Sequence, residues 1–193
     1  MNLFFVLLLA FSCFGKAGII ESNSFKSPNA NHKMQDTIKK PTVFLEESLT
    51  KPMTLLVIRD TAATVADISQ LFQKDYGELF TFINKNTLIP GKVMAFYHSY
   101  GPPFFVDVAV EVNRIPGLLT ERIKAKYLAG GNAVIARYQG PYEQVEIAYT
   151  AITNWLKQQR KEAKDKPFEV YLNHPSEGTD PFALRTDVYQ LIK

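Results

Sequence analysis

A short run near the C-terminus, residues 168–172, carries the side chains best suited to chemistry. In an extended strand, successive side chains point to opposite faces, so its three apolar residues share one face. Glu169 and Tyr171 share the other face. On a shielded face, a carboxylate beside aromatic rings favours a cation, whose charge offsets the desolvation of the carboxylate. On an open face, Glu169 would simply be solvated, and the alternation alone permits both interpretations.

The last apolar run, residues 184–192, alternates in the same way. We expect Asp187 and Tyr189 to share the face of Glu169, because they occupy every second position of this strand. Asp107 holds the corresponding place in an earlier strand. Hydrogen bonding at strand ends explains the two aspartates equally well, so this alternative stays open.

Residues of other common active sites are missing or scattered. There is no G-x-S-x-G nucleophile motif, and Gly130-Gly131 is an isolated pair that indicates a turn. The single cysteine, Cys13, excludes an intramolecular disulfide, and the three histidines lack zinc-ligand spacing. We therefore expect no metal and no cofactor. Glu169 and Tyr171 could still act as a general acid–base pair if burial raises the pKa of the carboxyl.

Two copies of one supersecondary pattern position these residues. Apolar residues at three- and four-residue spacing predict helices over 64–85 and 142–161, and β-branched apolar runs predict the strands. A short strand or turn is expected at 42–49. The expected strands span 54–59, 93–99 and 104–112 in the first copy, and 133–138, 168–172 and 184–192 in the second.

The two copies can be aligned, and the alignment predicts an asymmetric site. Ala95 takes the place of Glu169, and Tyr97 takes the place of Tyr171, so only one half supplies a charge there. Each β-α-β-β unit has one apolar sheet face under its helix. Two such units predict an α+β fold, with the first repeat over about 53–112 and the second over about 125–193.

The N-terminal part has the composition of an export signal followed by a linker. Its apolar run, residues 3–14, falls short of the roughly 20 residues that span a bilayer, but is typical of a signal peptide. We expect a signal peptide over 1–17, a flexible linker over 18–41 and a folded domain over 42–193 that is periplasmic or extracellular. Lipidation of Cys13 and a retained membrane anchor are the alternatives.

The net charge of +3 comes from 22 basic and 19 acidic residues. It is too small and too evenly spread to indicate a nucleic-acid surface. Nothing argues for an oligomer, so we expect a monomer.

Three stretches of the second copy carry a family resemblance: Gly140-Pro141-Tyr142-Glu143, the run 167–175 and Thr186-Asp187-Val188-Tyr189. With them, the chain resembles the GyrI-like family, the effector-binding domain of AraC-type bacterial transcription activators. The resemblance covers about residues 53–193, and the family is similar in fold to the SOUL haem-binding proteins.

This resemblance implies a pseudo-twofold pair of units, an antiparallel sheet with two long helices, and a cleft between the halves. It implies a hydrophobic or cationic small molecule as the ligand and Glu169 as the key acidic residue, with Tyr171 beside it. By register and alignment we add the remaining candidates to that cleft. They are Asp187, Tyr189, Tyr97 and Asp107.

The family is usually fused to a helix-turn-helix region, and the segment ahead of this domain is too short and too polar to form one. We therefore expect a stand-alone binding module without a nucleic-acid partner. Two alternatives follow from the same resemblance. One is a hydrolase with Glu169 and Tyr171 in acid–base roles, and the other binds haem or another tetrapyrrole through His98 or His174.

Overall fold

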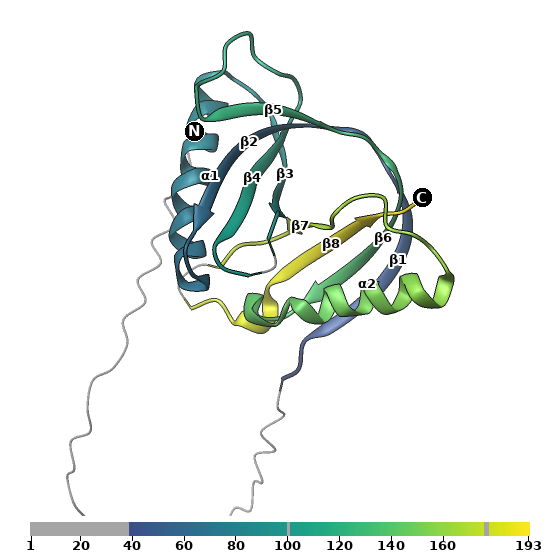
Figure 1. The fold of residues 1–193 in the computed structure, drawn as a ribbon. Coiled ribbons are helices and arrows are strands. Elements are labelled where there is room, and N and C mark those ends of the chain that lie inside the picture. Colours follow the sequence, from purple (N-terminus) through teal and green to yellow (C-terminus); the bar gives the residue numbers. More distant parts are fainter. Residues whose placement is uncertain (1–38, 100, 176–177) are drawn as a thin grey trace, which may run out of the picture.

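A computed structural model describes residues 39–99, 101–175 and 178–193. The signal peptide, Cys13 and most of the expected linker lie outside these residues. The described chain forms an eight-stranded antiparallel sheet, with the strand order β1-β6-β8-β7-β3-β4-β2-β5 and two helices on one face (Figure 1). No helix in this part of the chain is long and apolar enough to cross a bilayer.

The order β-α-β-β occurs twice, which confirms the predicted fold class. The helices are α1 (Ile68–Lys85) and α2 (Glu146–Gln159), preceded by the 3-10 turns η1 (Val65–Asp67) and η2 (Tyr142–Gln144); η3 (Pro181–Ala183) precedes the last strand. The strands are β1 (Thr42–Thr50), β2 (Met53–Ala62), β3 (Pro90–Tyr97), β4 (Phe104–Val112), β5 (Ile123–Leu128), β6 (Gly131–Gln139), β7 (Phe168–Tyr171) and β8 (Arg185–Leu191).

The sequence pattern missed β5 and indicated β1 only weakly. Both are edge strands, paired on one side only, β1 with β6 and β5 with β2. Most of their side chains are exposed or half-buried, so their sequences lack the apolar run that marks a central strand.

The sheet has a pseudo-twofold axis between β3 and β7. The strand order reads the same from either end when each strand is exchanged for its repeat partner, β3 for β7, β4 for β8, β2 for β6 and β5 for β1. In the seam between the halves, Ala95 of β3 pairs directly with Glu169 of β7. These two residues are also equivalent in the sequence alignment, so the axis passes through this pair.

A two-stranded ribbon joins the two ends of the sheet. Thr50 pairs with Gly131, and Met53 pairs with Leu128, so β1–β2 and β5–β6 run side by side across the open side (Figure 1). The sheet therefore curls into a ring. Its inside is packed with apolar side chains from β2, β3, β4, β6, β7 and β8.

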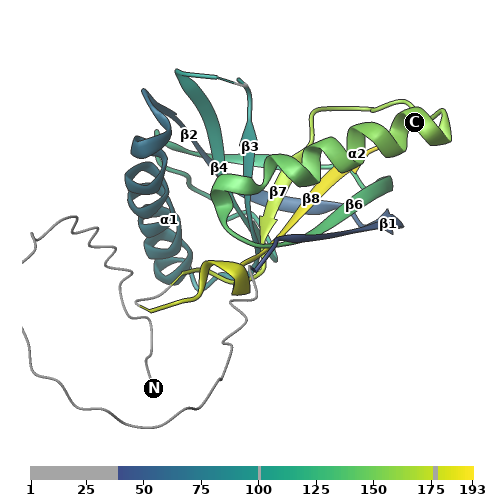
Figure 2. The ribbon, with the colours of Figure 1, turned by 90° about the horizontal axis from the view of Figure 1, so that it is seen from below.

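The helices cover the outside of this ring, one on each half (Figure 2). α1 buries Leu71, Leu79 and Ile83 against the first half, as its apolar stripe predicts. α2 buries Ala148 and Ile152 against the second half, with Trp155 partly buried beside them. The space above the β3–β7 seam therefore lies between two separately anchored helices.

We predict that Gly130→Ala destabilises the protein by about 1–3 kcal/mol through overpacking. A Cβ at Gly130 would lie 2.3 Å from the carbonyl oxygen of Thr50, in the ribbon that closes the ring. Backbone cannot yield as a flexible side chain would. Urea unfolding measures the loss.

Gly77→Ala is the matched control. Gly77 is exposed within α1, and a Cβ there meets nothing within 4 Å. This change should stabilise the protein by about 0.5–1 kcal/mol, because glycine loses more backbone entropy in a helix than alanine does. Equal stability of the Gly130→Ala variant and the wild type would contradict the tight crossing.

Candidate functional site

Glu169 lies at the centre of the sheet, on the face that carries the helices. β7 is a short strand between β8 and β3, and Glu169 pairs with Val188 on one side and Ala95 on the other. Both neighbours are apolar and fully buried, and Glu169 is only 5% exposed. The small side chain of Ala95 leaves the carboxylate room at the seam.

Two tyrosine hydroxyls bind the carboxylate, one at each oxygen. The hydroxyl of Tyr149, from α2, donates to Oε1 at 2.7 Å. The hydroxyl of Tyr171, two residues along β7, donates to Oε2 at 2.7 Å. The predicted pairing of Glu169 with Tyr171 on one strand face is thus present as a direct hydrogen bond.

Further aromatic rings surround this carboxyl group. Phe72 lies 5.5 Å from Tyr76 and 5.8 Å from Tyr171, measured between ring centroids. Tyr142 meets Tyr171 edge-on at 5.8 Å. The hydroxyl of Tyr76 donates to the carbonyl oxygen of Met94 in β3 at 2.7 Å. The aromatic cluster, as we use the term below, consists of Phe72, Tyr76, Tyr97, Tyr142, Tyr149 and Tyr171.

Burial dominates the electrostatics of the cluster. It raises the pKa of Glu169, and the two tyrosine hydrogen bonds only partly oppose this rise. Burial, followed by the nearby Glu169 carboxylate, raises the pKa of Tyr142 to about 12. The same two causes raise the pKa of Tyr171 and that of Tyr97. The tyrosines therefore stay neutral hydrogen-bond donors.

The carboxylate has no counter-charge within the described part of the chain. The ion pairs there involve other acidic groups, and the groups that act on the pKa of Glu169 are burial, Tyr171 and Tyr149 alone. A buried carboxylate is ordinarily paired with a cation or protonated. Glu169 is instead surrounded by rings and hydroxyls.

Three of the predicted site residues lie on the other face of the sheet. Asp187 pairs with Val170, Tyr189 pairs with Phe168, and Asp107 pairs with Phe96, so all three point into the ring. The prediction that they share the face of Glu169 was wrong. The apolar side chains of β7, Phe168 and Val170, pack inside the ring, so Glu169 is left on the face that carries the helices. Tyr97 and Tyr171 do lie on the Glu169 face.

The two aspartates instead form a duplicated arginine–aspartate pair inside the ring. Arg59 of β2 donates to Asp107 at 2.6 Å, and Arg137 of β6 donates to Asp187. Burial works to raise the pKa of Asp107, but hydrogen bonds from Arg59 and His98 outweigh it and leave that pKa lowered. Burial raises the pKa of Asp187 despite Arg137. These pairs cross between strands and explain both aspartates as structural residues.

Sequence reasoning missed the aromatic residues that the helices contribute. Phe72 and Tyr76 lie four residues apart in α1, on the side that faces the sheet. Tyr149 lies in the first turn of α2 and also faces the sheet. Polar-tipped aromatics within an apolar helical stripe were the available signal. Tyr142, from the turn before α2, packs against Tyr171 and donates to the carbonyl oxygen of Asn173 at 3.2 Å.

Neither of the two histidines in the described part of the chain belongs to the aromatic cluster. Nε2 of His98 lies 2.9 Å from Asp107 on the ring side, and His174 is exposed in the loop before β8. Within the described ranges, no three His, Cys, Asp or Glu residues gather as metal ligands.

Residues 50–193 match the family model of the GyrI-like small molecule binding domain. The C-terminal domain of EcmrR is similar in structure, with a TM-score of 0.67 and 16% identity over 79% of this chain and 98% of that chain. The structure of SAV2435 bound to tetraphenylphosphonium has a TM-score of 0.50 and 13% identity, over 78% of this chain and 94% of that chain.

EcmrR in its DNA complex gives a TM-score of 0.68 and 17% identity over 84% of this chain, which spans only 61% of that longer chain. A search of curated proteins gave no match. At these identities the structural likeness shows the fold, and the family model adds the family. With its paired repeats and central carboxylate, the chain belongs to the GyrI-like small-molecule-binding domain family.

Proposed function

We propose that this domain binds a hydrophobic organic cation between its two halves, with Glu169 as the charge anchor. The observation that carries the proposal is a carboxylate that is 5% exposed, ringed by aromatic side chains and without a cationic partner in the described residues. A cation placed there would supply the missing counter-charge.

The energetics favour a bulky cation with delocalised charge. Such a cation loses little hydration on entry, while the buried carboxylate gains a partner that offsets its desolvation. Each aromatic face in contact adds about 0.5–2 kcal/mol of cation–π attraction. A small inorganic cation would leave most of the rings of the aromatic cluster without a contact.

Entry of a ligand requires the cluster to open. Tyr149 and Tyr171 cap both oxygens of Glu169, and Tyr76 is held by its hydrogen bond to the backbone of β3. Aromatic side chains can rotate about two torsions without moving the sheet. We propose that the rings of α1 and α2 part to admit the cation and then close on its apolar surface.

Tetraphenylphosphonium is the probe we would use, because it is a rigid, lipophilic cation and is bound in the similar structure of SAV2435. At about one hundred times its Kd, it should stabilise the domain by about 2.7 kcal/mol in thermal unfolding. Glu169→Gln keeps the shape of the side chain and removes the charge. We predict that it weakens binding by at least tenfold, or about 1.4 kcal/mol, in calorimetric titration.

Two controls isolate the charge. Glu143→Gln neutralises an exposed carboxylate after Pro141 and should leave the Kd unchanged. Tetraphenylborate is nearly the same shape with a negative charge and should not bind at the site. Equal affinity of wild type and Glu169→Gln for the phosphonium would disprove the anchor.

The affinity should depend on pH through Glu169. Burial raises its pKa above the usual 4.5 in the free protein, and below that pKa a proton occupies the group that the cation needs. The Kd should then rise about tenfold per pH unit towards acid and stay constant above the raised pKa. Titrations between about pH 4 and pH 8 test this, with Glu169→Gln expected to give a flat profile.

The same shift has a consequence for the free protein. The folded state binds more protons than the unfolded chain, so its stability should fall as the pH rises from about 4.5 through the raised pKa. In urea unfolding, Glu169→Gln should lose the part of this fall that Glu169 contributes, whereas Asp187, whose pKa burial also raises, should keep its own part. A pH-independent Kd in the wild type would mean that Glu169 does not titrate in the binding step.

We also propose that the domain acts outside the cytoplasm. The apolar run at residues 3–14, followed by Gly15 and Ala17, supports export. N-terminal sequencing of the full chain after expression in bacteria should give a mature start at Gly18, in the periplasmic fraction or the medium. An intact N-terminus in the cytoplasm would contradict it, and a lipid-modified Cys13 would support the alternative anchor.

A further inference from the structure

A carboxylate interrupts the core-facing stripe of α1. The buried residues of this helix are Leu71, Asp75, Leu79 and Ile83, at four-residue spacing, and Asp75 is fully buried. Counting from the end of the preceding strand, the equivalent position of α2 is Ile152, which is also buried. The second half therefore packs the same helix position with an apolar side chain.

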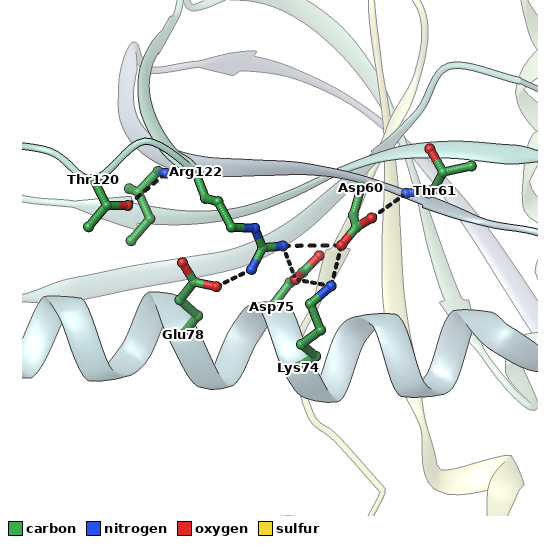
Figure 3. Close-up of polar contacts among 8 residues, drawn as sticks. Asp60, Thr61, Lys74, Asp75, Glu78, Thr120 and Arg122 are labelled. Atoms are coloured by element: carbon green, nitrogen blue, oxygen red, sulfur yellow. Dashed lines mark hydrogen bonds and ion pairs between the residues drawn. The ribbon is translucent and has the colours of Figure 1, made fainter.

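Asp75 is bound by an arginine that joins three elements, and Nζ of Lys74 lies 3.7 Å from the same carboxylate oxygen, Oδ1 (Figure 3). Nη2 of Arg122 donates to Asp75 Oδ1 at 2.8 Å and to Asp60 Oδ2 at 3.1 Å. Nη1 of the same guanidinium binds Glu78, one turn further along α1. Arg122 directly precedes β5, and Asp60 belongs to β2, so the guanidinium fastens α1 to two strands.

Packing a helix through a buried ion pair carries a large desolvation penalty. A buried ion pair loses the hydration of both charges, and apolar side chains of similar volume are often as stabilising. The second carboxylate oxygen of Asp75 has no hydrogen-bond partner in the described part of the chain. Since Ile152 meets the same packing need in α2, stability alone does not explain Asp75.

The turn of α1 that Arg122 grips also carries the wall of the aromatic cluster. Tyr76 directly follows Asp75, and Phe72 lies one turn before Tyr76 on the inner side. The two rings contact each other, and Phe72 also contacts Tyr171, whose hydroxyl binds Glu169. A rotation of α1 about its axis would shift both rings relative to the carboxylate.

We propose that Asp75 and Arg122 are a positioning pair that fixes the rotation of α1, and thereby sets the affinity of the cation site through Phe72 and Tyr76. The pair touches no ligand itself. The inference rests on the proposed function, because it concerns the wall of that same site. It gives a reason for the difference between the halves: the first half has the uncharged Ala95 at the seam, and its polar contact lies instead between Asp75 of α1 and Arg122.

The test replaces the pair as a whole. In Asp75→Ile/Arg122→Met, neither partner of the buried pair is left behind as a lone charge, and the helix position matches that of α2. Asp60 keeps its ion pair with Lys74 at 2.6 Å, and Glu78, which also loses Arg122, is partly exposed. We expect this variant to keep its urea unfolding free energy and to bind tetraphenylphosphonium about tenfold more weakly, as small displacements of binding groups do. Arg122→Lys keeps a charge but loses the planar fork, and should give a smaller loss of affinity.

A double-mutant cycle with Phe72→Ala/Tyr76→Ala separates positioning from general loosening. If the pair acts through these two rings, its removal should change the Kd less than about twofold once both rings are gone. Additive losses, or an unchanged Kd in both pair variants, would overturn the inference. Binding that is lost in Glu169→Gln but kept in the pair variants overturns the positioning role alone, whereas a wild type that binds no phosphonium overturns both proposals.

Discussion

Burying a carboxylate without a counter-charge destabilises a fold, and the position of Glu169 in this sheet limits that destabilisation. It sits on the pseudo-twofold axis, next to the smallest side chain that the facing strand could offer, Ala95. Both oxygens receive hydroxyl hydrogen bonds, from Tyr149 of one helix and Tyr171 of its own strand. These bonds reduce the desolvation cost without removing the charge. The aromatic cluster therefore keeps the carboxylate of Glu169 buried and hydrogen-bonded, but supplies no positive charge to pair with it.

The two repeats give the domain its pseudo-twofold symmetry, and a few sequence differences between them break this symmetry at the candidate site. Inside the ring the repeats remain alike, since Arg59–Asp107 and Arg137–Asp187 occupy equivalent strands. Even there the surroundings decide the outcome, because hydrogen bonds from Arg59 and His98 leave the pKa of Asp107 lowered while burial raises that of Asp187. On the helix face the repeats diverge, with a glutamate facing an alanine. The seam is therefore asymmetric, with a single charge between two similar walls.

The sequence was sufficient for the repeat, the central strands, both helices and the pairing of Glu169 with Tyr171, because each depends on local periodicity. It was insufficient for the face on which Asp107, Asp187 and Tyr189 lie. Alternation states that two residues of one strand share a face, but the face of one strand relative to the next depends on register, which is set by long-range pairing. Edge strand β5 lacked a pattern because half of it is solvated. The contribution of Tyr149 required knowing which helix stands beside β7.

The division of labour between sheet and helices follows from closure of the sheet. The ribbon of β1–β2 and β5–β6 removes the freedom of the two sheet ends, and stacked rings fill the inside, with Phe168 lying 5.0 Å from Phe96 and 5.1 Å from Tyr189. Such a packed ring does not deform gradually. Each helix, by contrast, packs on one half through its own apolar stripe. Adaptation to a ligand must then come from the helix layer and its rings, while the sheet holds the carboxylate still. The positioning pair Asp75–Arg122 is consistent with that arrangement. An apolar interface keeps α1 on the sheet but does little to fix the rotation of the helix about its axis, whereas directional hydrogen bonds do fix it.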